Sequence, residues 1–180
     1  DAARRVFAEL GYGAATVRDI IRATSLASGT FYNYFKSKEE VFQALRDETA
    51  LAIRPALREA RAKAETLEAF VAGTFRTFFG HVAANAENLS ATKRSEAPHV
   101  RVYTPEMVAG FEELRQDIEA AVTRGLLPPV DADYLTAAMV GVAFEIAETM
   151  RRKEGAPDVE GAVMFATALD RKSTRLNSSH

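Results

Sequence analysis

Apolar side chains recur at intervals of three and four residues along most of the chain, and no stretch alternates apolar and polar positions as a strand does. Residues that start helices (Ser, Thr, Asp) and residues that end them (Gly, Pro) interrupt this pattern. The pattern predicts an all-α protein with about eight or nine helices. The expected helices cover residues 1–10, 17–23, 27–34, 38–63, 66–84, 105–124, 131–153 and 158–169, with one short helix inside 85–98.

Three positions are expected to control where these helices begin or end. Gly11 suits the left-handed position that follows a helix, because glycine adopts it with little strain. Pro55 should kink or end the long helix that begins near Lys38, since proline lacks an N–H donor and crowds the preceding turn. Thr104 followed by Pro105 predicts a capped helix start.

The stretch 16–38 predicts two short helices joined by a tight turn at 24–26. Thr16 is a candidate N-cap, and Asp19 favours the exposed N–H groups of the first turn. On the second helix Phe31 and Phe35 are four residues apart and face inward, which leaves small polar residues and tyrosines outside. Such a surface fits a DNA major groove, where Ser, Thr and Asn reach base edges and Tyr hydroxyls reach phosphates.

The run GTFYNYFKSKEE, residues 29–40, resembles the signature of the TetR family of bacterial transcriptional regulators. That signature reads Gly-Thr-(Leu/Phe)-Tyr-x-(His/Tyr)-Phe-x-(Ser/Asn)-Lys-(Glu/Asp), and the upstream helix ending in Gly-Tyr, followed by Thr-Val-Arg-Asp-Ile, also matches. The resemblance covers residues 1–48. Family members often carry Gly in the turn and a basic residue before Gly-Thr. Here these are Ser25 and Ser28, which bears on operator preference more than on DNA binding.

The resemblance implies a helix-turn-helix DNA-binding domain at residues 1–46 and an effector-binding and dimerisation domain at 47–169. It also implies a repressor that leaves double-stranded operator DNA when a small molecule binds. A homodimer is expected to pack through helices 133–152 and 158–169, since the first of these carries small residues that suit a close helix seam. Burial of that face against the chain's own aromatic helix is the alternative.

The candidate DNA contacts lie on or beside the two short helices. Ser28, Thr30 and Asn33 are candidate base readers, while the basic and tyrosine side chains are candidate phosphate contacts. Gly29 is expected to allow close approach of the backbone, either to DNA or to the preceding helix. Composition alone is equally consistent with an ordinary helix surface. The full set is Thr16, Arg18, Ser28, Gly29, Thr30, Tyr32, Asn33, Tyr34, Lys36 and Lys38.

Large aromatic residues in 70–82 and an apolar stripe from Met107 to Ile118 either line a ligand cavity or form plain core. The pattern alone favours core, because any buried helix shows such a stripe. The family resemblance implies an effector pocket built from such helices, for an effector that we expect to be largely apolar. The candidate ligand-binding residues are Phe75, Phe78, Phe79, Val82, Tyr103, Met107, Phe111 and Met139.

Composition excludes several classes of function. The chain has no cysteine, so it has neither disulfides nor thiolate metal sites. Its net charge is −2, but residues 1–38 carry six basic groups against three acidic ones, which suits a DNA-reading head. No histidine–carboxylate spacing indicates a metal, no motif indicates a cofactor or enzyme chemistry, and no apolar run predicts a membrane span. A cytoplasmic protein that is not an enzyme is therefore expected.

Two alternatives to the ligand-responsive repressor stay open. One is a DNA-binding dimer without an effector, whose body is a scaffold, and the other is an α-helical enzyme.

The ends of the chain carry a separate expectation. Residues 170–180 match, residue for residue, the translation of a common sequencing adapter. We therefore interpret the chain as a fragment that lacks its N-terminal start and has a non-native tail at 170–180, with the last native helix ending at Leu169.

Overall fold

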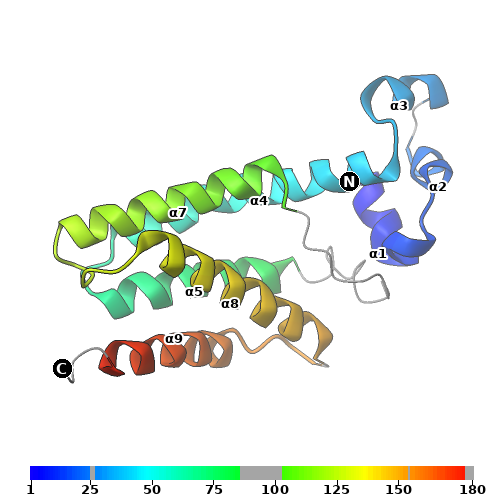
Figure 1. Cartoon of the computed structure of the whole chain (residues 1–180). Helices are drawn as coiled ribbons and strands as arrows, with labels where there is room; N and C mark the ends of the chain where they lie inside the picture. The colour runs from blue at the N-terminus through cyan, green and yellow to red at the C-terminus, as the bar shows by residue number, and fades with distance from the viewer. Residues whose placement is uncertain (25–26, 86–102, 154, 177–180) are drawn as a thin grey trace. The chain divides into compact units, whose positions relative to one another are not determined.

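The computed structural model describes residues 1–24, 27–85, 103–153 and 155–176, with side chains up to Ala168. All regular structure in these residues is helical, which confirms the all-α prediction (Figure 1). The turn residues Ser25 and Leu26 and the short helix expected inside 85–98 lie outside the described residues. The helices are α1 (Ala2–Ala14), α2 (Val17–Arg22), α3 (Ser28–Tyr34), α4 (Lys38–Ala62), α5 (Leu67–Ala84), α7 (Pro105–Thr123), α8 (Ala132–Arg152) and α9 (Val159–Leu176).

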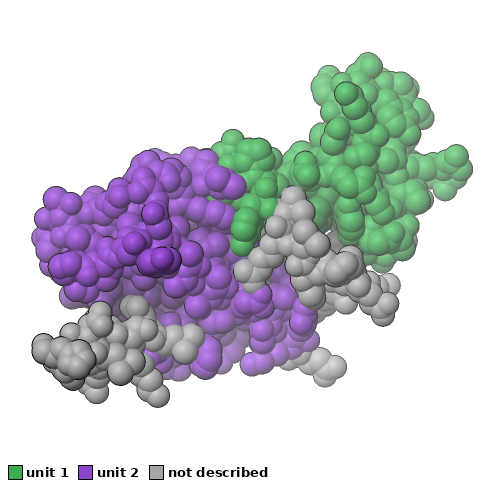
Figure 2. Space-filling view, in the orientation of Figure 1, with its two compact units in different colours: residues 1–51, 85–107 green, residues 52–84, 108–180 purple. Residues whose placement is uncertain are grey.

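The chain divides into two compact units, coloured separately in Figure 2. Unit 1 holds Asp1–Leu51 with the described part of 85–107, and unit 2 holds Ala52–Ala84 with Val108 onward. Helix α4 contributes its first half to unit 1 and its second half to unit 2. This is a division by packing, and the functional domains expected at 1–46 and 47–169 stay a prediction.

Unit 1 is built around a small core to which α1, α2, α3 and α4 each contribute. Phe7 and Ile20 are each 2% exposed, and Phe31 of α3 is buried beside them, as its position in the sequence predicts. The ring of Phe42 meets Phe7 edge to face, with 5.6 Å between the ring centroids. This contact fixes α4 on α1, because aromatic pairs in this geometry stabilise beyond their buried area.

Unit 2 has a larger core in which α5 is the central element. Its buried side chains pack against α8 and α9, and α7 adds Leu114 and Ile118 to the same core. Phe75 and Phe79, one turn apart on α5, stack with their ring centroids 5.6 Å apart. The bidentate pair of Arg76 with Glu160 joins the surfaces of α5 and α9.

Several helix ends follow the expected local chemistry. Gly11 adopts a φ of 77°, so the regular part of α1 ends there, as expected, and the helix resumes for a short turn. The hydroxyl of Thr66 accepts from the N–H of Ala69 at the start of α5. The carboxylates of Asp131 and Asp158 cap α8 and α9 in the same way. These caps satisfy N–H groups that have no partner inside their own helix.

Two expectations about helix ends are met only in part. Helix α4 does not end at Pro55 but continues to Ala62, close to the expected span of 38–63. Both Pro55 and Leu51, whose carbonyl loses its N–H partner, are exposed, so water can satisfy that oxygen. Helix α7 begins at Pro105, as expected, but Thr104 is buried and its hydroxyl has no hydrogen-bond partner among the described residues. Asp47 of α4 accepts from the N–H of Glu106 in its place.

One expectation about a helix end is wrong, and it concerns the last helix. Helix α9 does not end at Leu169 but continues to Leu176. Residues 170–176 contain no Gly or Pro and include Arg, Lys and Leu, which are good helix formers. The interpretation of 170–180 as a non-native tail stays a prediction.

Candidate functional site

A capping box fixes the start of α2, the first of the two short helices in unit 1. The hydroxyl of Thr16 accepts from the N–H of Asp19, while the Asp19 carboxylate accepts from the Thr16 N–H at 3.0 Å. The hydroxyl of Thr16 also donates to the Asp19 carboxylate, and this hydrogen bond, followed by that from the Thr16 N–H, lowers the pKa of Asp19, so the carboxylate stays charged. Thr16 was predicted both as a cap and as a DNA contact, and its hydroxyl is used in the cap.

Helix α3 presents one buried and one exposed face. Phe31 is 4% exposed, whereas Tyr32 is 53% and Tyr34 is 73% exposed. A Cβ atom added at Gly29 would meet no described atom within 4 Å, so this glycine makes no close approach to a neighbouring described helix. Nine of the ten candidate DNA contacts are exposed, namely Thr16, Arg18, Ser28, Gly29, Thr30, Tyr32, Asn33, Tyr34 and Lys36.

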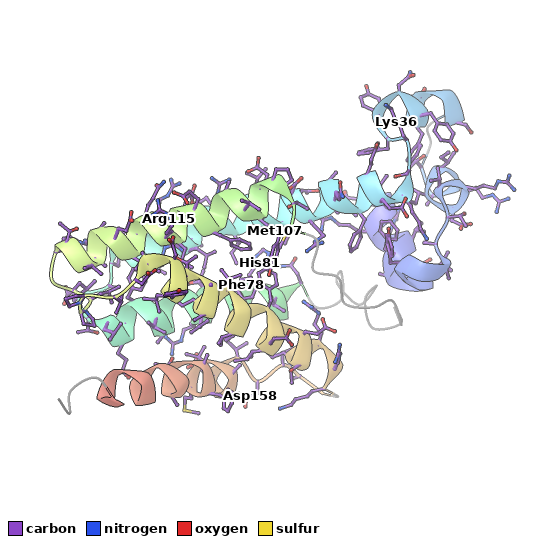
Figure 3. The ribbon with its side chains drawn as sticks, viewed as in Figure 1. Lys36, Phe78, His81, Met107, Arg115 and Asp158 are labelled. Atoms are coloured by element: carbon purple, nitrogen blue, oxygen red, sulfur yellow. The ribbon has the colours of Figure 1, made fainter. Side chains whose placement is uncertain are left out.

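The turn between α3 and α4 is closed by side chains of α4's first turn. The hydroxyl of Ser37 accepts from the N–H of Glu40 and so caps the start of α4. The Glu40 carboxylate accepts from the backbone N–H of Lys36 at 2.7 Å. Lys36 therefore has a fixed backbone and an exposed ammonium group at the end of α3 (Figure 3).

Lys38 is the tenth candidate, and it differs from the others. Its side chain is half-buried, and its ammonium donates to the backbone oxygens of Tyr12, Gly13 and Ala15 at 3.0, 3.2 and 3.1 Å. The ammonium also lies 4.8 Å from the centroid of the Tyr12 ring. The Tyr12 hydroxyl donates to Glu39 Oε1 at 3.0 Å.

These interactions of Tyr12, Lys38 and Glu39 were missed from the sequence. Burial, followed by the hydrogen bond to Glu39 and the Glu39 charge, raises the pKa of Tyr12 to about 12. No spacing rule links Tyr12 to residues on α4, because local helix rules reach only three or four positions. The one local signal was the position of Tyr12 directly after the helix-ending Gly11.

The candidate ligand-binding residues divide between plain core and a half-buried aromatic cluster. Phe75, Phe79, Val82 and Met139 are at most 6% exposed and belong to the core of unit 2. Tyr103, which is 37% exposed, and Met107, which is buried, belong to unit 1.

The remaining two candidates, Phe78 of α5 and Phe111 of α7, meet the same partner. Phe144 of α8 contacts the Phe78 ring at 5.5 Å and the Phe111 ring at 6.1 Å, in both cases edge to face. All three rings are half-buried. We call Phe78, Phe111 and Phe144 the aromatic cluster; Phe144 was not among the predicted ligand contacts.

His81 follows Phe78 by one turn on α5 (Figure 3). Burial lowers the pKa of His81, which favours a neutral imidazole at neutral pH. A neutral imidazole can donate and accept one hydrogen bond each.

The first 45 residues match the family model described as "Bacterial regulatory proteins, tetR family". This match covers the capping box, α3 and the Lys36–Lys38 turn. The chain belongs to the TetR family.

Similarity to members of this family extends beyond the head. The HTH-type transcriptional repressor KstR2 of Rhodococcus jostii (strain RHA1) is 32% identical over 130 residues, which are 69% of this chain and 64% of KstR2. The chain thus spans just under two thirds of that relative. The HTH-type transcriptional repressor DhaR of Mycobacterium sp. (strain GP1) is 27% identical over 155 residues, 79% of this chain and 77% of DhaR.

Solved structures share the fold over nearly the whole chain. The fatty acid degradation regulator FadR from Bacillus halodurans superposes with a TM-score of 0.72 at 23% identity, covering 94% of this chain and 90% of that protein. The regulator FadR from Bacillus subtilis, solved in complex with stearoyl-CoA, gives a TM-score of 0.73 at 22% identity, covering 93% and 95%. These likenesses confirm the TetR-like fold.

Membership of a family of regulators agrees with the expectation that this chain is not an enzyme. Within the described ranges, no three His, Cys, Asp or Glu side chains are grouped so that they could hold a metal ion. None of the described helices is both long and apolar enough to cross a membrane.

Proposed function

We propose that this protein is a TetR-family transcriptional repressor, which binds operator DNA as a homodimer and is released by a largely apolar small molecule. The observation that carries the proposal is the exposed polar face of α3 inside a head that matches the family model. Repressors named among its relatives support the direction of regulation.

The dimensions and chemistry of α3 suit base reading. An α-helix with its side chains is about 10–12 Å across, which fits a major groove about 12 Å wide, and the seven residues of α3 form two turns of such a helix. We assign base reading to Ser28, Thr30 and Asn33, because their short polar side chains are exposed on α3. The hydroxyls of Tyr32 and Tyr34 and the cations of Arg18 and Lys36 are assigned to phosphates.

Large exposed side chains on both α8 and α9 support a homodimer. Tyr134 is 78%, Met164 is 68% and Phe165 is 61% exposed, which is unusual for side chains of this size. Ala138 is exposed as well, one turn after Tyr134, and its small side chain suits a close helix approach. A two-fold dimer would present its two α3 helices to half-sites about 34–36 Å apart, or multiples of that spacing.

The aromatic cluster supports an apolar effector. Phe78, Phe111 and Phe144 come from three helices and are only half-buried, so a ligand that covers them gains hydrophobic free energy. The solved complex of the Bacillus subtilis FadR with stearoyl-CoA makes an acyl-CoA the first probe. Such a ligand weakens operator binding by the ratio of its affinities for the free and DNA-bound states.

The test is selection of binding sites from a random duplex pool, followed by anisotropy titrations. We expect a palindromic site, and we expect Asn33→Ala to lose about 1–3 kcal/mol of discrimination at one base pair. The matched control is Gln43→Ala, which changes an exposed amide on α4. Equal affinity of the wild-type protein for selected and random DNA would contradict the proposal.

The effector is tested separately with stearoyl-CoA added to the preformed complex. Release of the selected duplex, weakened by Phe78→Ala, supports an effector site at the aromatic cluster. A DNA complex that is insensitive to acyl-CoA and to a wider set of apolar ligands would favour the scaffold without an effector.

A further inference from the structure

Two lysines on either side of Ser37 have the same chemistry and opposite surroundings. Lys36 is exposed at the end of α3, whereas Lys38 is half-buried in the first turn of α4. The Lys38 ammonium has three N–H donors, and three backbone oxygens lie within hydrogen-bond distance of it. Its hydrogen-bonding capacity is therefore used inside unit 1.

The three oxygens converge because α1 is interrupted at Gly11. The φ of 77° at this residue directs the chain into a short extra turn, and the oxygens of Tyr12, Gly13 and Ala15 come after the break. Carbonyl oxygens at the C-terminal end of a helix carry partial negative charge and attract a cation. A compact ammonium suits three converging oxygens better than the planar guanidinium of Arg does.

Tyr12 strengthens the same junction with both its ring and its hydroxyl. The ring lies 4.8 Å from the Lys38 ammonium, within the range of a cation–π interaction. The hydroxyl donates to the carboxylate of Glu39, the residue that follows Lys38. We call Tyr12, Lys38 and Glu39 the α1–α4 latch, because they join the end of α1 to the first turn of α4.

We propose that Lys38 is a positioning residue and not a phosphate ligand: through the α1–α4 latch it holds the first turn of α4 on the end of α1. Lys36 is the phosphate ligand of the pair. The latch rests on the geometry of unit 1, and only its consequence for DNA rests on the proposed function. To reach a phosphate, Lys38 would have to give up three hydrogen bonds and the Tyr12 ring.

The latch acts on DNA binding through Lys36 and α3. The Lys36 N–H is held by Glu40, which lies in the same first turn of α4 as Lys38. If the latch is lost, this turn is free to shift and the end of α3 shifts with it. Loss of Lys38 should therefore weaken DNA binding without removing a charge contact.

Salt dependence of DNA binding separates the two roles. Affinity for a random-sequence duplex is measured between about 50 and 200 mM salt, where each lost phosphate contact reduces the log–log slope by about 0.9. We expect Lys36→Met to reduce the slope by this amount. Lys38→Met should lower affinity by the same factor at every salt concentration, keep the slope and lower the melting temperature of the protein. A Lys38→Met slope reduced like that of Lys36→Met, at an unchanged melting temperature, would overturn the proposal.

A second measurement does not depend on whether the protein binds DNA. The ammonium resonances of ¹⁵N-labelled lysines are recorded on the free wild-type protein, and Lys38 is assigned by its loss in Lys38→Arg. We expect a slowly exchanging Lys38 ammonium without DNA, and no such signal from Lys36. A Lys38 signal that appears only when DNA is added would overturn the latch. Absence of any DNA binding by the wild type would instead refute the proposed function. The α1–α4 latch would then be tested by the ammonium spectrum of the free protein alone.

Discussion

Arg61 Nε on α4 donates a 2.6 Å hydrogen bond to Asp117 Oδ2 on α7, although the Arg61 side chain is only 4% exposed. One turn and two turns earlier on α4, Arg58 and Arg54 both pair with Glu113 of α7. Ion pairs thus join the second half of α4 to α7 within unit 2. Arg61 is the most buried residue of these pairs, and a buried cation without its partner is costly.

We expect Asp117→Asn to lower the free energy of unfolding by about 1.5–3 kcal/mol, the range for a hydrogen bond to a charged group. Asp117 is 36% exposed, which keeps the effect below that of a fully buried pair. Urea unfolding monitored by far-UV circular dichroism gives the value. The control is Arg58→Ala, at a cation that is 62% exposed, for which a loss above about 1 kcal/mol would contradict this account.

The helix caps of unit 1 predict the effects of two substitutions on stability, one destabilising and one stabilising. Thr16→Ala removes the capping box of α2 and should destabilise unit 1 by about 1 kcal/mol. Helix α3 begins after Ala27, which offers no side-chain cap, so Ala27→Asp should stabilise α3 by up to about 1 kcal/mol. Hydrogen exchange of the α2 and α3 amides measures both changes. Equal protection in the two variants would show that the caps contribute nothing.

Alkaline pH should weaken unit 1 through Tyr12. The pKa of Tyr12 is raised from 10.0 to about 12, first by burial and then by Glu39, so the folded state keeps a proton that the unfolded state loses. The stabilisation is fully present below pH 10 and is lost as the pH rises to about 12. The observable is the pH dependence of hydrogen exchange in unit 1, corrected for the intrinsic rate. In Tyr12→Phe, the loss of stability between pH 10 and about 12 should be smaller. An unchanged pH dependence in that variant would refute the assignment of this loss to Tyr12.

The exposed side chains of α8 and α9 predict how dimerisation responds to charge. Phe165→Glu places a carboxylate where the proposed seam buries an aromatic ring, and it does so once in each protomer. We expect the dimer dissociation constant to rise at least about tenfold, since burying one Phe contributes about 1.5–3 kcal/mol. Sedimentation velocity is the measurement. Ala120→Glu, at an exposed position of α7, is the control and should leave the dimer intact.

Much of the local structure could be predicted from the sequence. The capping box at Thr16 and Asp19, the cap at Asp131 and the left-handed turn at Gly11 all depend on residues within four positions of one another. The inward position of Phe31 and the exposed positions of Tyr32 and Tyr34 follow from helical periodicity. The family could be inferred as well, because its signature is one continuous run of residues.

Only the tertiary structure decided which of two chemically identical lysines is available at the surface. Lys36 and Lys38 are two positions apart, but the oxygens that bind Lys38 lie more than twenty residues earlier in the chain. In the same way, Asp47 and not Thr104 accepts from the N–H of Glu106 in the first turn of α7. Phe78 and Phe111, on two different helices, both contact the ring of Phe144. Local rules describe neighbours on one helix. Partners on different helices are selected by how those helices pack, which depends on the whole core at once.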